Sequence, residues 1–422
     1  PKPTTRPCGK SSPRPSCNIA SGPAEICNAM IALPLTLAAI CLPVAMIWLS
    51  RHVKISREKR AGLLLNPDSP GPPDSAPKIS VVVAAKDEAA CIEACVRTML
   101  DQDYPNFDLT VCDDRSTDAT AEIVRRVAQE DSRLRLLGVR ELPAGWCGKS
   151  NAMQKAIATT DGEWICMIDA DCRQESSRTL SVAMQYATDT GADLLSVLPR
   201  LETKSFWENV IQPICGGVMM IWFTPEKVNS PRHANAYANG AFILIRRQAY
   251  QAIGTHEAVR DRISEDMHLA RLVKEAGLQL RVIRGQGLYV VRMYTSLGQI
   301  LRGWSRIFYG TFGTLKRLTI SLALMLVVGM LPYGAIGAGL AGVLAGAAPG
   351  WAWIASAAAG AAAAAIQLSV IRRFYRLINA RADLFWTYPI GCAVTLWALI
   401  LSLSKLFGGK IVWKDTGYKS AR

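Results

Sequence analysis

The stretch Gly162–Cys172, GEWICMIDADC, decides how this chain folds. Its apolar run, Trp164 to Ile168, is typical of a fully buried strand, and the run stops at Asp169-Ala170-Asp171. Alternate residues of an extended chain point the same way, so both carboxylates are expected on one side of the strand's end. Ligands of open α/β sheets bind at the carboxyl ends of strands. The pair therefore favours a bound divalent cation, with a solvated acidic turn as the alternative.

Apolar runs and helical segments alternate on both sides of this stretch, with short connections between them. Such alternation predicts an α/β fold with a doubly wound, mainly parallel sheet. The further expected strands are 79–85, 109–112, 133–139, 193–199, 239–246 and 278–283. The expected helices are 89–100, 119–129, 152–159 and 265–276, and 206–223 is an apolar amphipathic segment. A helix over 296–315 has the spacing of an amphipathic helix lying on a membrane, with an ordinary amphipathic helix packed on the sheet as the alternative.

Acidic residues follow three of the expected strands at their carboxyl ends: Asp87-Glu88, Asp113-Asp114, and Asp169 with Asp171. A parallel sheet presents these ends on one edge, so the acids are expected to converge. Carboxylates can accept hydrogen bonds from a nucleoside, and Lys149 could offset the charge of a diphosphate. A Walker A loop would need glycine where Pro143 stands, which disfavours an ATPase.

The segment Ser264-Glu265-Asp266 opens an expected helix, with Ser264 as its N-cap. Acids in a first helical turn are common for structural reasons alone. Beside a nucleotide-binding edge, Asp266 becomes a candidate general base for an acceptor hydroxyl. The four histidines show no ligand spacing and are assigned to the surface or the core, and the twelve cysteines include no CxxC pair, which indicates a reduced, cytoplasmic main domain.

Half of the 422 residues are hydrophobic, and the excess is concentrated in apolar runs. The run 30–49 has the length of a membrane anchor, 319–371 is uncharged and long enough for two spans, and 384–404 is a further span. Basic residues flank these runs, which suits an anionic membrane surface and not a nucleic acid. They are Arg51, Lys54, Arg57, Lys59, Arg60, Arg372, Arg373, Arg376 and Arg381.

The count of spans conflicts with the charge of the C-terminal tail. One anchor, two spans and one more would put the tail outside, whereas Lys405, Lys410, Lys414 and Lys419 favour the inside. Either the last run is re-entrant or one apparent span does not cross the membrane.

Five motifs stand in order along the chain: ISVVVAAKDE (79–88), DDRSTDAT (113–120), GWCGKSNA (145–152), DADC (169–172) and SED (264–266). Together they resemble a membrane-bound family 2 glycosyltransferase with a GT-A fold, over roughly residues 77–310. The resemblance implies transfer of a hexose from a UDP-sugar, with inversion at the anomeric carbon. It implies that Asp171 with Asp169 holds Mg²⁺ or Mn²⁺, and that Asp266, beside Glu265, is the catalytic base. The residues that it places at the nucleotide are Ala85, Asp87, Asp113, Asp114, Lys149, Asn151 and Asp169.

Many membrane-spanning relatives carry a Q-x-x-R-W motif on an interfacial helix. This chain has Gln299, Arg302 and Trp304 as candidate acceptor-side residues, but Gly303 stands where the tryptophan would be. The departure weakens the interpretation as a processive polysaccharide synthase. The GWCGKSNA loop and the segment 413–418 are loosely similar to a subgroup associated with hopanoid and carotenoid pathways, from which Asp415 and Thr416 depart.

We therefore expect an enzyme of the cytoplasmic membrane that glycosylates a membrane lipid, with its catalytic domain facing the cytoplasm. The alternatives are a processive polysaccharide synthase, or a membrane transporter or scaffold with a nucleotide-sugar-binding domain. The uncharged spans argue against transport. The expected segments are a disordered tail (1–26), an anchor (27–50), a basic, proline-rich linker (51–76), the GT-A domain (77–295), an interfacial helix (296–317), transmembrane helices (318–406) and a basic tail (407–422).

Overall fold

The computed structural model describes residues 23–60, 64–408, 411–413 and 416–418. Most of the expected N-terminal tail (1–22), and Lys410, Lys414, Asp415 and Lys419 of the C-terminal tail, lie outside these residues. The chain divides into two compact units. One unit consists of Pro1–Val44 and Leu331–Ala364, and the other of Ala45–Met330 and Ala365–Arg422.

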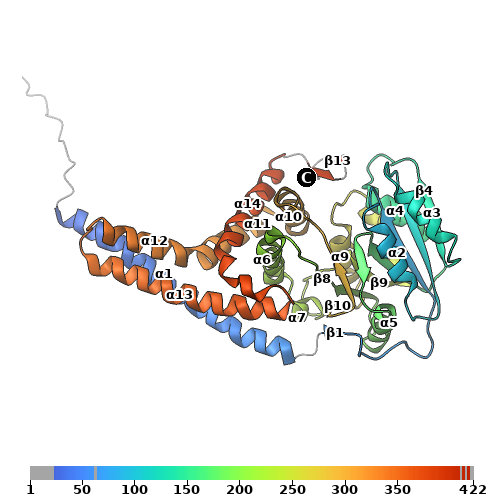
Figure 1. Cartoon of the computed structure of the whole chain (residues 1–422), viewed down its shortest axis with the longest axis horizontal. Coiled ribbons are helices and arrows are strands. Elements are labelled where there is room, and N and C mark those ends of the chain that lie inside the picture. The colour runs from blue at the N-terminus through green and yellow to red at the C-terminus, as the bar shows by residue number, and fades with distance from the viewer. Residues whose placement is uncertain (1–22, 61–63, 409–410, 414–415, 419–422) are drawn as a thin grey trace, which may run out of the picture. The chain divides into compact units, whose positions relative to one another are not determined.

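An eight-stranded sheet lies at the centre of the second unit (Figure 1). The strand order is β1-β10-β7-β9-β5-β2-β3-β4, and all neighbours are parallel except β9, which is antiparallel to both β5 and β7. This confirms the predicted mainly parallel, doubly wound α/β fold. The strands are β1 (Leu64–Leu65), β2 (Ile79–Ala85), β3 (Phe107–Asp114), β4 (Leu134–Val139), β5 (Trp164–Asp169), β7 (Leu194–Leu198), β9 (Phe242–Arg246) and β10 (Leu280–Gly285).

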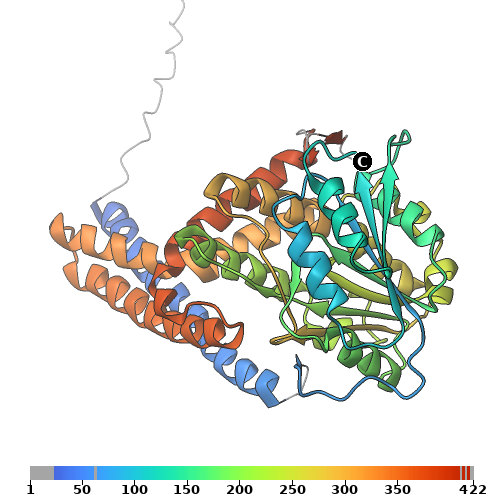
Figure 2. The same ribbon diagram turned by 45° about the vertical axis from the view of Figure 1, so that its right-hand side comes forward.

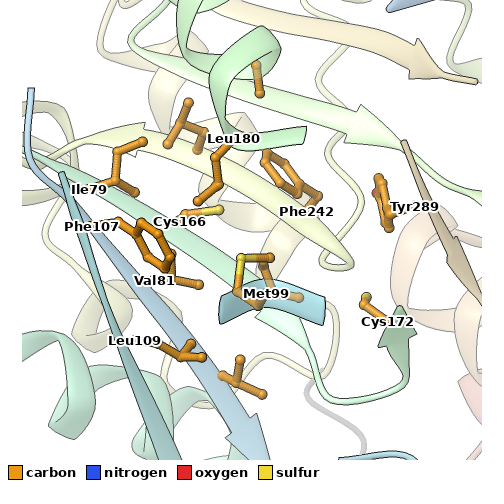
Figure 3. Packing of buried hydrophobic residues seen from close by; sticks show 14 of the residues in the cluster. Ile79, Val81, Met99, Phe107, Leu109, Cys166, Cys172, Leu180, Phe242 and Tyr289 are labelled. Carbon is orange, nitrogen blue, oxygen red and sulfur yellow. The ribbon is translucent and has the colours of Figure 1, made fainter. Parts of the chain in front are cut away.

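Helices α2 (Ile92–Leu100), α3 (Thr120–Ala128) and α5 (Thr179–Asp189) share one hydrophobic cluster with the sheet. Figure 3 shows this core, in which Val81, Leu109, Cys166 and Phe242 of four strands meet Met99 of α2 and Leu180 of α5. Helix α4 (Gly148–Ala158) returns the chain from β4 to β5 on the other face, as a right-handed crossover requires. The remaining elements here are α7 (Pro225–Val228), α8 (Arg247–Ala252), the 3₁₀ helix His256–Val259 and α9 (Glu265–Glu275).

A second, three-stranded sheet was not predicted from the sequence. It consists of β6 (Cys172–Gln174), β11 (Tyr289–Val291) and β8 (Arg200–Leu201), in that order. Strand β6 begins directly after Asp171, so the chain turns back at the acidic pair instead of entering a helix. The turn fixes the pair between two sheets.

Within the described part of the chain, four helices are long and apolar enough to cross a membrane, judged by length and composition. The first is α1 (Pro23–Arg60), which continues as helix through the basic residues after position 50. The second runs from α11 (Leu315–Leu324) through a π-helical segment (Met325–Met330) into α12 (Leu331–Leu344). The third is α13 (Gly350–Leu377), and the fourth comprises a 3₁₀ turn (Ala382–Thr387) and α14 (Tyr388–Leu406).

Helices α6 (Phe206–Trp222), α10 (Leu297–Phe312) and α14 pack against one another beside the main sheet (Figures 1 and 2). The helix expected over 296–315 is shorter than the sequence indicated, because Gly313 ends α10 in the left-handed conformation and Thr314 caps α11. Its apolar side chains, among them Ile300, Trp304 and Phe308, are buried within the protein. These side chains therefore pack against protein, not lipid.

Candidate active site

Three strand ends carry the predicted acids to one edge of the main sheet. Asp169 of β5 pairs with Ala84 of β2, and the next residue, Ala85, pairs with Asp113 of β3. The carboxyl ends of β2, β3 and β5 are thus side by side. The convergence expected from the sequence follows directly from this parallel register.

Lys149 lies at the centre of the carboxylates. It is in the first turn of α4, and its Nζ donates to Asp169 Oδ1 at 2.6 Å and to Glu265 Oε1 at 2.7 Å. Burial alone would lower the pKa of this lysine, but the carboxylates of Asp169, Glu265 and Asp266 raise it well above its ordinary value. Lys149 therefore remains a cation that links strand β5 to helix α9.

Asp266 is held by two backbone amides. Its Oδ2 accepts a hydrogen bond from Gly240 N at 2.9 Å, and its Oδ1 accepts one from Met267 N at 2.7 Å. Burial, followed by repulsion from Glu265, raises the pKa of Asp266 to about 7. A carboxyl in this state can take up and release a proton near neutral pH.

Gly240, just before β9, leaves the space that this cluster needs. A Cβ at position 240 would lie 2.9 Å from Lys149 Nζ, 3.3 Å from Asp266 Oδ2 and 3.7 Å from Asp169 Oδ2. No local sequence pattern indicates this contact, because the four residues come from four separate segments.

Ser264 does not act as the predicted side-chain cap of α9. It stands at the N-cap position, but its hydroxyl makes no capping hydrogen bond. Helix α10 approaches so closely there that a Cβ at Gly310 would lie 2.2 Å from Ser264 Oγ. Contact with α10 thus replaces the cap, and the side chain of Asp266 itself accepts from Met267 N in the first turn.

Asp171 has the environment expected of a cation ligand. Its Oδ1 is buried and has no hydrogen-bond partner among the described residues. Burial, then the charges of Asp169 and Glu88, raise its pKa to about 8. No group of three or more His, Cys, Asp or Glu residues with a metal-binding arrangement occurs in the described part of the chain. Asp169 and Asp171 fit Mg²⁺ or Mn²⁺, because such ions are held by one or two carboxylates together with substrate phosphates.

The predicted nucleotide-binding residues have different surroundings. Asp114 is buried and accepts two hydrogen bonds, both 2.8 Å long, from the guanidinium of Arg115. Asp87 adopts a left-handed backbone conformation (φ 52°), and its Oδ1 accepts from Thr117 N at 2.7 Å, which ties the β2 and β3 loops together. The atoms Asp113 Oδ1 and Asn151 Nδ2 are buried without a hydrogen-bond partner in the described structure.

A cavity of about 1190 Å³ opens from this cluster. Ten predicted site residues line it: Ala85, Asp114, Lys149, Asp169, Asp171, Glu265, Asp266, Gln299, Arg302 and Trp304. Asp87, Asp113 and Asn151 are not among its lining residues. Part of its wall is apolar and is formed by Met219 and Met220 of α6, Phe223 directly after α6, Ile307 of α10, and Phe374 and Leu377 of α13.

Tyr294 is a cavity residue that the sequence did not single out. Its ring fills the space beside Gly303, where a Cβ would lie 2.1 Å from the ring carbon Cζ. Arg306 Nη2 donates to its hydroxyl at 3.4 Å, and burial raises the pKa of that hydroxyl. Gly303 was visible as a departure from Q-x-x-R-W, but the residue that occupies its space was not.

The three predicted acceptor-side residues all belong to α10 and line the cavity. Gln299 Oε1 accepts from Thr295 N at 3.0 Å. Trp304 is buried, with its ring centroid 5.4 Å from that of Phe308, and its Nε1 has no partner among the described residues. The helix thus presents both polar and aromatic groups to the cavity.

Comparison with known proteins assigns part of this site to a known domain family. Residues 80–254 match the family model "Glycosyl transferase family 2". The chain is 29% identical over 198 residues to the beta-monoglucosyldiacylglycerol synthase of Nostoc sp., a match that covers 46% of this chain and 41% of that protein. It is 28% identical over 114 residues to the GalNAc(5)-diNAcBac-PP-undecaprenol beta-1,3-glucosyltransferase of Campylobacter jejuni, covering 27% of this chain and 35% of that one. The matches thus span less than half of each relative.

Among solved structures, the fold is similar to the mannosyltransferase PcManGT of Pyrobaculum calidifontis, solved in complex with GDP-Man and Mn²⁺. The TM-score is 0.51 at 20% sequence identity, and the match covers 88% of this chain and 99% of the other. At this identity the likeness concerns the fold. Together with the family match, it confirms the predicted resemblance: residues 80–254 match the family 2 glycosyltransferase model, and the fold is similar to that of a GT-A glycosyltransferase.

Proposed function

We propose that the chain is an inverting glycosyltransferase that moves a sugar from a UDP-sugar to a hydroxyl group of a membrane lipid. One observation carries the proposal: the carboxylate and lysine cluster opens into a cavity with an apolar wall made by α6, α10 and α13. A nucleotide-sugar needs only the polar part of this cavity. The apolar part suits the hydrocarbon of a lipid acceptor.

In this mechanism Asp266 accepts the proton of the acceptor hydroxyl as the oxygen attacks the anomeric carbon. The bond from that carbon to the diphosphate breaks, and UDP leaves with the bonding electron pair. The amides of Gly240 and Met267 hold the Asp266 carboxylate in one orientation, and Lys149 brings a fixed positive charge to the same site. Asp87, Asp113, Asp114, Asn151 and Ala85 would contact the nucleotide.

Asp171 and Asp169 would hold Mg²⁺ or Mn²⁺, which when bound neutralises the charge of the leaving diphosphate. Asp171 supports this role, because its unpartnered, buried oxygen gains a partner only when a cation or proton is present. The positive charge of Lys149 already offsets part of the negative charge of Asp169 and Glu265. The lysine thus limits the excess negative charge that the cation must balance.

The proposed acceptor is a hydroxylated membrane lipid, and the proposed position of the catalytic domain is the cytoplasmic side of the membrane. The Nostoc relative is named for beta-monoglucosyldiacylglycerol, which makes diacylglycerol the first acceptor to test. The similarity of the GWCGKSNA loop to the hopanoid-associated subgroup makes a hydroxylated hopanoid the second. The basic residues that follow the first apolar run favour a cytoplasmic position for the catalytic domain.

The test is nucleotide release by the detergent-solubilised full chain, measured across a panel of UDP-sugars with GDP-mannose as a further donor. Each donor is combined with diacylglycerol or a hydroxylated hopanoid, with Mg²⁺ or Mn²⁺, and with EDTA. We expect metal-dependent release with one donor and a loss of about 10²–10⁴-fold in Asp266→Asn. Asp261→Asn is the matched control, because this aspartate is exposed and pairs with Arg262 at 3.2 Å.

The products separate the alternatives. One sugar per lipid supports the proposal, whereas a long polymer would indicate a processive synthase. Metal-dependent UDP binding without turnover on any donor would favour the transporter or scaffold interpretation. Full activity in Asp266→Asn would exclude this residue as the base.

A further inference from the structure

We propose that α14 does not cross the membrane but lies with α11 at the bilayer surface on the catalytic side. The chain then crosses the membrane three times, through α1, through the π-helical segment with α12, and through α13. Its C-terminus lies on the same side as the active site. All contacts that carry this inference lie within the second unit.

The basic ends of α1 and α13 mark the level of the membrane surface. The apolar part of α1 ends before Arg51 and Lys54, and that of α13 ends before Arg372 and Arg373. Arg373 Nη1 lies 2.6 Å from His52 Nδ1, and Arg373 Nη2 donates a hydrogen bond to Ser56 Oγ at 2.9 Å. The two basic ends are therefore side by side. Because basic residues collect where a spanning helix leaves the bilayer, we call this level the basic boundary.

The second apolar helix passes the basic boundary near Val328, well inside its own length. Trp48 Nε1 donates to Val328 O at 2.9 Å, and Gln367 Nε2 donates to the same oxygen at 3.0 Å. Trp48 and Gln367 precede Arg51 and Arg372 by about 4 to 8 Å along their helices, at 1.5 Å per residue. The carbonyl of Val328 therefore lies only about 4 to 8 Å from the basic boundary, on its bilayer side.

The length of the second apolar helix, Leu315–Leu344, agrees with a basic boundary near Val328. From Met325 to Leu344 the helix is about 30 Å long, the thickness of the hydrocarbon core. The whole segment Leu315–Leu344 has 30 residues and would be about 45 Å long. The excess is α11, which thus lies outside the core on the catalytic side.

Helix α14 begins at the basic boundary. The Tyr388 ring packs edge-on against Trp48, with centroids 5.8 Å apart. A Cβ at Gly329 would lie 3.5 Å from Cys392 Sγ and 3.6 Å from Tyr388 Oη. The first turn of α14 is thus at the level of Trp48 and Gly329.

The other end of α14 lies at the catalytic helix α10. Ser402 Oγ donates to Ser305 O at 2.8 Å, and Lys405 Nζ donates to Ser305 Oγ at 2.9 Å. Ser305 is on α10 between Arg302 and Arg306, both of which line the active-site cavity. If α14 crossed the membrane, its C-terminal end would lie about 28 Å from its first turn, on the far side of the bilayer. Both of its ends instead meet elements of the catalytic side.

The exposed face of α14 fits a lipid surface. Ile390, Trp397 and Ile400 are exposed and recur at helical spacing, and Leu315 and Ile320 are exposed on α11. Tryptophan is enriched at the level of lipid head groups. Three crossings also place the C-terminal lysines of the sequence on the same side as the basic boundary, which removes the conflict between span count and charge.

The test compares the two ends of the full chain in sealed membrane vesicles. Short epitopes are added to the N-terminus and to the C-terminus, and their removal by protease is measured before and after detergent. We expect one end to be protected and the other to be accessible, because three crossings put them on opposite sides. Equal accessibility of both ends would establish an even number of crossings and overturn the proposal.

A third epitope, inserted after Gln129 in the exposed turn between α3 and β4, reports the catalytic side. We expect it to be accessible in the same vesicles as the C-terminal epitope. Elution of each tagged chain as a single species in detergent verifies folding. Should this insertion not fold, the two terminal epitopes still decide between three and four crossings.

Discussion

Replacement of Gly240 with alanine would test whether the position of Lys149 controls the chemistry of the site. The backbone at this glycine is not left-handed, so alanine adds no conformational strain there. Its Cβ would lie 2.9 Å from Lys149 Nζ, about 0.5 Å closer than an ordinary contact of 3.4 Å. The ammonium group must therefore move away from its present position.

The magnitude follows from the two hydrogen bonds of Lys149. Displacement by about half an ångström lengthens one or both of the bonds to Asp169 and Glu265, now 2.6 and 2.7 Å. Hydrogen bonds to charged groups contribute about 1.5–3 kcal/mol each, so partial loss of two costs about 1–2 kcal/mol. If this cost falls on the transition state, kcat/KM decreases by about 5–30-fold.

The assay is donor-dependent nucleotide release, measured together with the melting temperature of the solubilised chain. We expect Gly240→Ala to lower kcat/KM while the melting temperature changes little, because one flexible side chain absorbs the contact. Gly138→Ala is the matched control, since no atom lies within 4 Å of a Cβ there. A Gly240→Ala chain that keeps kcat/KM within about twofold of wild type, while Lys149→Met is inactive, would refute this reasoning.

Three further predictions concern stability and are measured by unfolding of the detergent-solubilised chain. Gly303→Ala should destabilise it by about 1–3 kcal/mol through overpacking against Tyr294, and the same change should cost less in a Tyr294→Ala chain; additive effects of the two changes would contradict the contact. Burial lowers the pKa of His256 to about 3, below its ordinary value near 6.5. Between these values the unfolded chain binds one more proton than the folded chain, so stability decreases as the pH is lowered. From pH 7 to 5 this group should cost about 2 kcal/mol, and a His256→Gln chain with the same pH dependence would exclude it as the cause. Ser205→Ala should cost about 1 kcal/mol, because it removes the capping box that Ser205 forms with Glu208 at the start of α6; an unchanged unfolding midpoint would show that the cap is dispensable.

The main strands were predictable because they are buried on both faces. Strand β2 has the predicted bounds Ile79–Ala85, and β5 follows the apolar run from Trp164. Helix α5 was missed because its buried face includes polar residues. Thr179 and Ser181 are fully buried there, and Ser181 donates to Asp103, so the apolar period of the helix is interrupted.

The convergence of the acids was predictable for a topological reason, whereas the contacts among them were not. Parallel strand ends must meet at one edge, which brought Asp113 and Asp169 together without knowledge of any side chain. The bond of Lys149 to Glu265 depends on where α9 packs, and no local pattern encodes that position. Ser264 was predicted to cap α9, but its hydroxyl makes no capping hydrogen bond and instead lies against Gly310, which is far along the chain. No local pattern encodes this contact either.

The basic boundary and the cavity together constrain how an acceptor would reach Asp266. Phe374 and Leu377 line the apolar wall and follow Arg372 on α13 by about 3–8 Å, at 1.5 Å per residue. On the proposed membrane placement, this part of the apolar wall lies at the level of the lipid head groups. On the proposed function, a hydroxyl at that level could approach the base while its hydrocarbon stays in the bilayer. We therefore expect a long-chain diacylglycerol in bilayers to be a better acceptor than a water-soluble short-chain analogue, since only the former is held at this level.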